Sequence, residues 1–487
     1  MKTAKVENGF VQGKVKEVLG KEIVQFLCIP YCKAPLNKLR FQRSQNIDHF
    51  SENVINKLEF ETCFPQTSLR IFDGTNEGEE RWIPKHAHDE DSLYLNIWCP
   101  LDVFNGKVQK PVLVWIHGGG FMTGSSSMPI YDGSVLSSQE NIIVVNINYR
   151  LGIFGYLYLN HELANGNQGL WDQVLALQWI HRNITVFNGD SNNITICGNS
   201  AGGCSVSFHL LIKESWGTFN KAIMHSGVCT IDWSLLPKEE VFRRSETLVN
   251  RLLERLKYPL KWNEQISSDD KKSIIEYLQS LNFKDIILDS ELYAGMYQLA
   301  WSPIIDGELI KDNPRDMFLR EEYKICPTIF LHSKNEGDMF ILYEFPKIQP
   351  DNEGMIDVTY LDHILKYYPY YPLICEPSVK ELIKKKYNVN GTKVSIKKVD
   401  EIISDQHIIC DTIDLANIVS RSNKEVYYLI FNALFPNDYW PPWCGVLHGD
   451  EIFCLFGNSL VNGYKTECEK KTSIEFMKNY GNFITNG

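Results

Sequence analysis

Residues 193–203 read Asn193-Ile194-Thr195-Ile196-Cys197-Gly198-Asn199-Ser200-Ala201-Gly202-Gly203, and a helical pattern continues from there. An apolar strand therefore runs into G-x-S-x-G and then into a helix, the context in which a serine occupies a strained turn with its hydroxyl exposed. Gly198 and Gly202 fit this turn because side chains there would collide with closely packed backbone. The stretch predicts that Ser200 is a nucleophile between a strand and a helix.

Outward from this stretch, short apolar runs alternate with helical patterns, which predicts an α/β fold. The section from about 230 to 320 is helix-rich and is expected to insert on top of the sheet. We therefore expect a single domain over 1–487 with a central, mostly parallel sheet, flanking helices and helical insertions over the active site. Strands are expected at 111–116, 142–147, 193–197, 220–224, 327–332 and 425–431, and helices at 169–183, 201–212, 239–257, 376–387, 401–420 and 470–485.

Composition excludes several classes of function. Hydrophobic residues make up 44% of the 487 and charged residues 22%, as in ordinary globular proteins. The formal net charge of −11 argues against nucleic acid as a partner, because Lys and Arg supply most of that affinity. No apolar stretch approaches the roughly 18 residues that span a bilayer. The 13 cysteines contain no C-x-x-C pair, so no metal site is expected.

A second glycine-rich stretch follows the strand expected at 111–116. His117-Gly118-Gly119-Gly120-Phe121 has the H-G-G-G form of an oxyanion loop, in which glycines let backbone N–H groups point at one spot. A serine nucleophile needs such fixed donors for the oxyanion that its attack creates. We expect the N–H groups of Gly119, Gly120 and Ala201 to be these donors.

The serine also needs a base and an acid, which follow it in chain order in this kind of fold. His448 lies in the glycine-flanked loop 445–451, after the strand expected at 425–431, whereas His332 lies inside a strand pattern and His407 inside a helix. His448 is therefore the predicted base. The acid is expected on the loop after 327–332, where composition leaves both Glu336 and Asp338 open.

Taken together, the motifs resemble the type-B carboxylesterase and cholinesterase family over nearly the whole length. The matching pieces are 26–31, 39–41, 90–97, 117–121, 148–152, 169–173, 198–203, 335–337 and 445–449. The resemblance implies an α/β-hydrolase fold, a serine ester hydrolase that acts through an acyl-enzyme, and no cofactor. In this family a glutamate immediately before glycine is the triad acid, which selects Glu336 over Asp338.

Departures from the family pattern concern the cysteines and the C-terminus. Ser92 stands where the family usually has the cysteine that pairs with the match of Cys63, so that disulfide is not expected. Cys410 resembles a cysteine whose partner lies near the family's C-terminus, beyond Gly487, and we expect the chain to be truncated there. The missing disulfide partners and the absence of an apolar leader favour an intracellular protein, unless a leader has been removed.

For the substrate, the resemblance supplies two aromatic candidates. Trp82 has the spacing of the tryptophan that binds choline in cholinesterases, and such a ring attracts a quaternary ammonium by roughly 0.5 to 2 kcal/mol. Tyr131 also resembles a position in the cholinesterase gorge. Against a choline ester, Asn199 replaces a glutamate and Met339 replaces an aromatic residue.

Tyr297 and Leu299 fall near the acyl-pocket positions of the family, where one ring and one aliphatic side chain suggest a short to medium acyl group. We therefore expect a general carboxylesterase acting on a small-molecule ester. A choline-ester hydrolase is the alternative within the family. A catalytically silent adhesion protein is the alternative outside enzymes, although such relatives lack triad residues that this chain retains.

Overall fold

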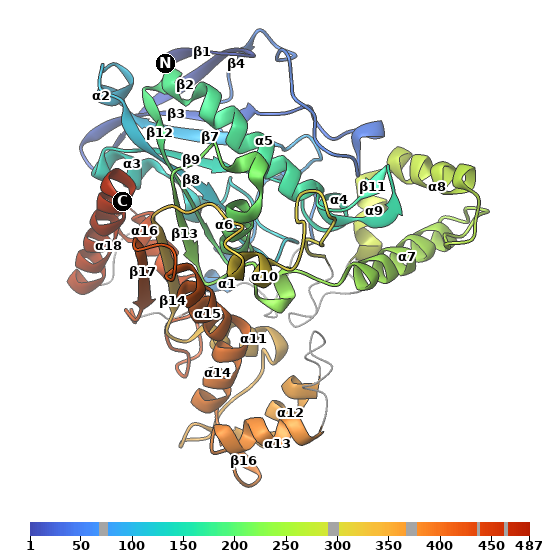
Figure 1. Ribbon diagram of the computed structural model, residues 1–487. Helices are drawn as coiled ribbons and strands as arrows, with labels where there is room; N and C mark the ends of the chain where they lie inside the picture. Colours follow the sequence, from blue (N-terminus) through green and yellow to red (C-terminus); the bar gives the residue numbers. More distant parts are fainter. Residues whose placement is uncertain (68–75, 291–300, 367–376, 436–438, 462–465) are drawn as a thin grey trace.

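A computed structural model describes residues 1–67, 76–290, 301–366, 377–435, 439–461 and 466–487, and its largest feature is an eleven-stranded mixed sheet (Figure 1). Its strands follow the order β1-β2-β3-β7-β9-β8-β12-β13-β14-β17, and β4 pairs with β2. The strands are β1 Lys2–Val6, β2 Gly9–Val18, β3 Lys21–Pro30, β4 Val54–Ile55, β7 Tyr94–Pro100, β8 Lys110–Ile116, β9 Ile143–Ile147, β12 Gly189–Asn199, β13 Lys221–His225, β14 Thr328–Ser333 and β17 Val426–Phe431.

The sheet is parallel from β9 to β17 and antiparallel from β1 to β9. In the parallel strands β8, β9, β13 and β14 both faces are buried, which explains why the sequence there is continuously apolar, whereas Leu429 and Ile430 of the edge strand β17 are exposed. In β8, for example, Val112 and Val114 belong to the core on one face, and Leu113 and Trp115 to the core on the other. All six expected strands are therefore confirmed.

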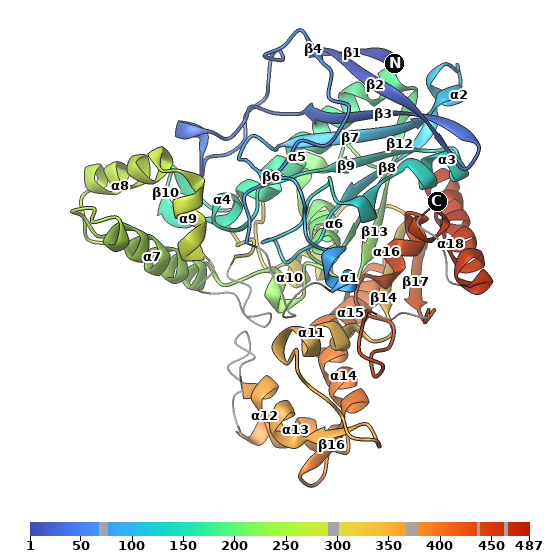
Figure 2. The same cartoon turned by 180° about the vertical axis from the view of Figure 1, so that it is seen from behind.

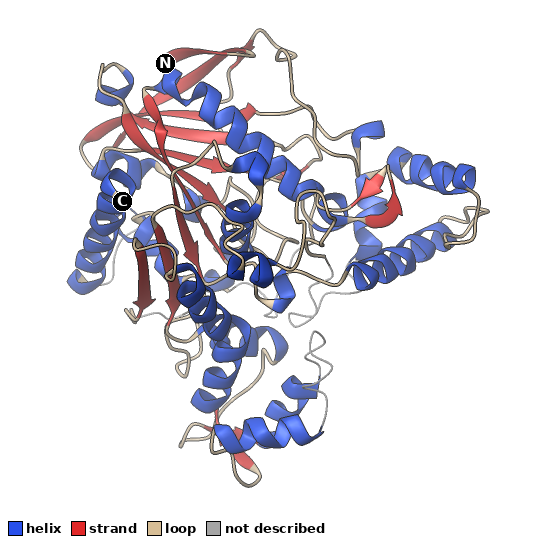
Figure 3. Cartoon of the chain, in the orientation of Figure 1, coloured by secondary structure: helices blue, strands red, loops and turns tan. Residues whose placement is uncertain are grey.

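Helices cover both faces of the sheet (Figures 1 and 3). One face packs against α5 and α6, and the opposite face against α3, α16 and α18, which Figure 2 shows side by side. The helices are α1 Glu77–Glu80, α2 Leu101–Phe104, α3 Ser134–Glu140, α4 Gly152–Tyr156, α5 Gln168–Asn183, α6 Ala201–Leu211, α7 Lys238–Arg255, α8 Ser268–Ser280, α9 Phe283–Ser290, α10 Pro314–Leu319, α11 Glu336–Glu344, α12 Val358–Lys366, α13 Pro377–Lys386, α14 Ile396–Ser404, α15 Cys410–Val419, α16 Asp450–Leu455, α17 Asn458–Val461 and α18 Glu467–Asn486.

Two groups of helices extend beyond the layers that cover the sheet. Helices α7 to α9 form a lobe at one side, in the helix-rich section expected from about 230 to 320, and α12 to α14 form another lobe (Figure 1). The helix expected over 401–420 is confirmed as helical backbone from α14 to α15, but a π-helical turn at Asp405–Ile409 joins the two. Such turns are rare, and many occur at functional sites.

Parallel strands place their carboxyl ends at one edge of a sheet, where α/β proteins bind ligands. Here β8 leads into the loop of Gly118, β12 into Ser200, and β14 into Glu336. The topology therefore brings the predicted catalytic segments to one edge. Within the described residues, no helix combines the length and the apolar composition that crossing a bilayer requires.

Candidate active site

Ser200 occupies a strained turn between β12 and α6. Its backbone has φ 58° and ψ −126°, a conformation that side-chain-bearing residues rarely adopt. The Ser200 N–H donates to the carbonyl of His225 at 2.8 Å, which fixes the turn to the end of β13. Close backbone packing explains the glycines, since a Cβ at Gly202 would lie 2.0 Å from the Ile116 oxygen and one at Gly227 would lie 2.2 Å from the Ser200 oxygen.

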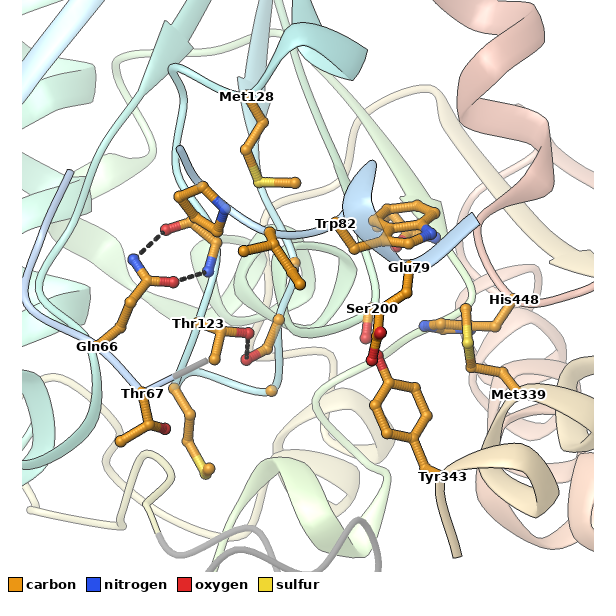
Figure 4. Close-up of a pocket in the computed structure, with 18 of the residues that line it drawn as sticks. Gln66, Thr67, Glu79, Trp82, Thr123, Met128, Ser200, Met339, Tyr343 and His448 are labelled. Atoms are coloured by element: carbon orange, nitrogen blue, oxygen red, sulfur yellow. Dashed lines mark hydrogen bonds between the residues drawn. The ribbon is translucent and has the colours of Figure 1, made fainter. Parts of the chain in front are cut away.

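His448 and Glu336 are joined by a short hydrogen bond. The carboxylate can only accept, so His448 Nδ1 donates to Glu336 Oε2, at 2.6 Å. Glu336 Oε1 accepts from the Ser226 hydroxyl and the Ser333 N–H, both at 2.6 Å. Figure 4 shows the imidazole of His448 directed toward Ser200. The arrangement leaves Nε2 of His448 for a proton from the serine.

Asp338, the other acid that composition left open, has a different set of partners. Its Oδ2 accepts from the Gly445 N–H at 2.7 Å, on the loop that leads to His448. Burial and the neighbouring Asp400 raise the pKa of Asp338 well above its usual range. Asp338 therefore braces the histidine loop, while Glu336 contacts the imidazole itself.

Electrostatics separate His448 from the other buried histidines near the loop and pocket. Burial would by itself lower the pKa of His448, but the Glu336 carboxylate outweighs burial and raises it. Burial lowers the pKa of His117 to about 4, and burial together with nearby His448 lowers that of His407 to about 3. At neutral pH His117 and His407 are therefore uncharged, whereas the Glu336 carboxylate favours the protonated form of His448.

The glycine loop after β8 lies against the nucleophile. Gly119 has φ 112° and Gly120 has φ 59°, both in the region that favours glycine. A Cβ at Gly118 would lie 3.0 Å from Ser200 Cβ. Across the described part of the chain, the N–H groups of Gly119, Gly120 and Ala201 donate to no other protein group, so they are available to an oxyanion.

A pocket opens beside Ser200 and contains three of the five predicted substrate-binding residues. Trp82, Tyr131 and Met339 line it, whereas Tyr297 and Leu299 lie outside the described residues. Figure 4 shows Trp82, Glu79, Met339 and Tyr343 grouped around Ser200 and His448. Other lining residues include Gln66, Ile83, Met122, Met128, Trp233, Phe340 and His407.

Sequence reasoning missed several of these residues. Glu79 is 1% exposed and lines the pocket from α1, three residues before Trp82, but this four-residue helix is too short for its spacing to indicate the residue. Glu79 is the one carboxylic acid among the described lining residues, which include no lysine or arginine. Gln66 braces the glycine loop, because its side chain exchanges two hydrogen bonds with the Gly124 backbone, at 2.7 and 2.9 Å (Figure 4). No sequence signal marks Gln66.

The cysteines follow the expectation drawn from the family pattern. Throughout the described ranges, every cysteine is a free thiol. Cys63 is buried, and the Ser92 hydroxyl lies 2.7 Å from both the Asp89 carbonyl, to which it donates, and the Thr62 hydroxyl, from which it accepts. Hydrogen bonds thus stand where the family pattern has a disulfide.

Comparisons with known proteins agree with this geometry. The model of the carboxylesterase family matches residues 1–487. The chain is 32% identical over 494 residues to a cholinesterase of Mus musculus, and 32% identical over 491 residues to an acetylcholinesterase of Bungarus fasciatus; each alignment covers 99% of this chain and 78% of the relative. It is 30% identical over 499 residues to an acetylcholinesterase of Leptinotarsa decemlineata, with the same coverage. The chain therefore has the α/β-hydrolase fold, belongs to the carboxylesterase family and is a carboxylic ester hydrolase.

Proposed function

We propose that this enzyme hydrolyses short to medium acyl esters through an acyl-enzyme on Ser200, with His448 as general base and Glu336 as the acid of the triad. The observation that carries the proposal is the 2.6 Å bond between His448 and Glu336, with the imidazole directed toward a serine in a strained turn. Ester hydrolysis gives each of these three residues a role, whereas adhesion would need none of them.

In the first half of the reaction, Ser200 Oγ attacks the ester carbonyl carbon and His448 Nε2 takes the serine proton. The N–H groups of Gly119, Gly120 and Ala201 stabilise the oxyanion of the tetrahedral intermediate. His448 then gives its proton to the alkoxide oxygen, so that the alcohol leaves. In the second half, water attacks the acyl-serine with His448 again as base, and the acid leaves as Ser200 regains its proton.

The side chains that line the pocket support an uncharged ester with a short acyl chain as the substrate. Trp233, Phe340 and Tyr343 present bulky rings, which leave room for a small acyl chain rather than a long one. Apolar lining favours desolvation of the ester, as in most small-molecule sites.

A second candidate is an ester of a cationic alcohol, such as a choline ester. Trp82 offers an aromatic face, and the buried carboxyl group of Glu79 lines the same pocket. The relatives named cholinesterase also favour this candidate. Asn199 disfavours it, because the residue before the nucleophile carries no charge here.

The test compares the wild type with Ser200→Ala on a neutral short-chain aryl ester and on the matching thiocholine ester. We expect the wild type to hydrolyse the aryl ester and the variant to lose that activity. Trp82→Ala and Glu79→Gln then rank the two candidates. If a cationic group binds beside these two residues, both variants should raise KM for the thiocholine ester and leave KM for the aryl ester unchanged. A folded wild type inert on both esters would instead support the adhesion alternative.

A further inference from the structure

A fully buried chain of polar side chains lies behind the triad, and the proposed mechanism does not use it. The Tyr480 hydroxyl contacts His225 Nε2 at 2.7 Å, and His225 Nδ1 contacts Glu451 Oε1 at 3.1 Å. Tyr480 is 1% exposed and the other two residues are 0% exposed. The three come from α18, the end of β13 and α16, which are distant in sequence. The chain therefore ties the C-terminal helix to the centre of the sheet.

Glu451 connects this chain to both sides of the triad. Its Oε1 accepts from Asn199 Nδ2 at 3.0 Å, and Asn199 is the residue immediately before the nucleophile. Its Oε2 accepts from the Ser333 hydroxyl at 3.1 Å, and the Ser333 N–H in turn donates to Glu336. The Glu451 carboxylate thus holds both Asn199, the neighbour of Ser200, and Ser333, which donates to Glu336.

His225 makes a second connection through its backbone. Its carbonyl accepts the Ser200 N–H at 2.8 Å, so a shift of this residue moves the nucleophile directly. The ring itself is fixed by Tyr480 on one side and Glu451 on the other.

The hydrogen bonds also determine where the proton of His225 lies. A carboxylate can only accept, so Nδ1 carries the proton and donates to Glu451. Nε2 faces the Tyr480 hydroxyl, and in this tautomer the hydroxyl donates to it. Burial tends to raise the pKa of Glu451, but the hydrogen bond from His225 outweighs burial and lowers it. Three donors therefore keep Glu451 ionised without a lysine or arginine among its described hydrogen-bond partners.

We propose that His225 and Tyr480 are positioning residues for ester hydrolysis, which act through Glu451 to hold Asn199 and Ser333 and thereby the geometry of Ser200 and Glu336. The proposal rests on the proposed triad, and it gives His225 and Tyr480 a supporting role outside the triad. Without the Tyr480 hydroxyl, the buried Nε2 of His225 loses its donor and the ring loses one of the two contacts that fix it. The ring is then free to shift, and Glu451 shifts with it and carries Asn199 and Ser333 out of place.

This role predicts an effect on kcat rather than on KM, because neither His225 nor Tyr480 lines the pocket. Tyr480→Phe removes one hydroxyl and little volume, and we expect kcat to fall by about five- to tenfold, as for one lost hydrogen bond, with KM unchanged. Tyr156→Phe is the matched control. Tyr156 is likewise 0% exposed, but its hydroxyl has no hydrogen-bond partner within the described residues, so kcat should stay within about twofold of wild type.

A conservative variant separates positioning from general stability. His225→Asn places an amide N–H near the former Nδ1, so it retains a donor for Glu451 and should keep most of kcat, whereas His225→Leu should lose it. Adding Tyr480→Phe to His225→Asn should lower kcat no further, because the Tyr480 hydroxyl acts through Nε2 of His225, an atom that asparagine lacks. Rates are divided by the concentration of sites labelled with an aryl phosphonate, so unfolded protein does not count.

Two results would overturn the proposal. One is a kcat for Tyr480→Phe equal to that of Tyr156→Phe. The other is a Tyr480→Phe loss that persists undiminished in the His225→Asn background. A Ser200→Ala enzyme that retained activity would instead remove the proposed triad itself, so the two failures are distinguishable.

Discussion

At the residue scale, two acids follow the end of β14 within five positions, and their hydrogen bonds separate their roles. Glu336 donates nothing and accepts from His448, Ser226 and Ser333, while Asp338 accepts from the backbone of the histidine loop. Composition left the two acids open because the difference depends on which way each side chain points from the first turn of α11. Family resemblance selected Glu336, and the contacts agree with that choice.

Replacing Glu336 with glutamine is expected to lower kcat by about a thousandfold or more, because the amide no longer fixes the imidazole tautomer. The pH profile should change as well. The carboxylate raises the pKa of His448, so its loss lowers that pKa, and the acidic limb of kcat/KM moves to lower pH. The check is a pH–rate profile on a neutral aryl ester.

Asp338→Asn is the control for this prediction, since within the described residues Asp338 hydrogen-bonds to the Gly445 backbone and not to the imidazole, and its raised pKa already favours the neutral form. We expect this variant to keep the acidic limb in place and to lose less than about tenfold in kcat. An equal loss in both variants, or an acidic limb unmoved by Glu336→Gln, would show that Glu336 is not the acid of the triad.

At the scale of elements, the turn between β12 and α6 depends on close backbone contact. Gly202→Ala would place a Cβ 2.0 Å from the Ile116 oxygen of β8. Because backbone cannot give way cheaply, we expect the free energy of unfolding to fall by about 3 kcal/mol or more, measured by urea denaturation. Gly217→Ala is the matched control, since nothing lies within 4 Å of its added Cβ and a change within about 0.5 kcal/mol is expected. Equal stability of the two variants would contradict this packing.

Most elements near the site could be predicted from the sequence, because buried parallel strands read as continuous apolar runs with turns between them. The π-helical turn at Asp405–Ile409 could not, because it changes the hydrogen-bond spacing within a continuing helix without breaking the apolar pattern. The contribution of Glu79 and Gln66 to the pocket was also missed. Both belong to the segment between β4 and β7, whose short elements carry little periodicity.

At the scale of the whole molecule, buried carboxyl groups make stability depend on pH. Burial raises the pKa of Asp400 to about 6. A carboxyl whose folded pKa lies above its unfolded value of about 3.9 stabilises the fold below that unfolded value, and this stability is lost as pH rises through about 6. The folded chain therefore becomes less stable, through this group, between acidic and neutral pH.

Asp400→Asn removes that dependence. From pH 4.5 to pH 8 the wild type should lose about 2 kcal/mol of its free energy of unfolding through this group, and the variant should not. Measured by urea denaturation at both pH values, the free energy of unfolding of the variant relative to wild type should therefore be about 2 kcal/mol higher at pH 8 than at pH 4.5. Asp269→Asn, at an exposed position in α8, is the control and should show no such gain. A pH-independent difference between Asp400→Asn and wild type would refute this account of the buried carboxyl.

The account as a whole depends on Ser200 as the nucleophile, and covalent labelling tests this most directly. The enzyme is incubated with an aryl phosphonate ester, digested, and mapped by mass spectrometry, with Ser200→Ala treated in parallel. We predict one phosphonyl group per chain, on the peptide that contains Ser200, with loss of ester hydrolysis in proportion to labelling and no label on the variant. Hydrolysis that continues after Ser200 is fully labelled, or loss of hydrolysis with the label on another residue, would contradict the account.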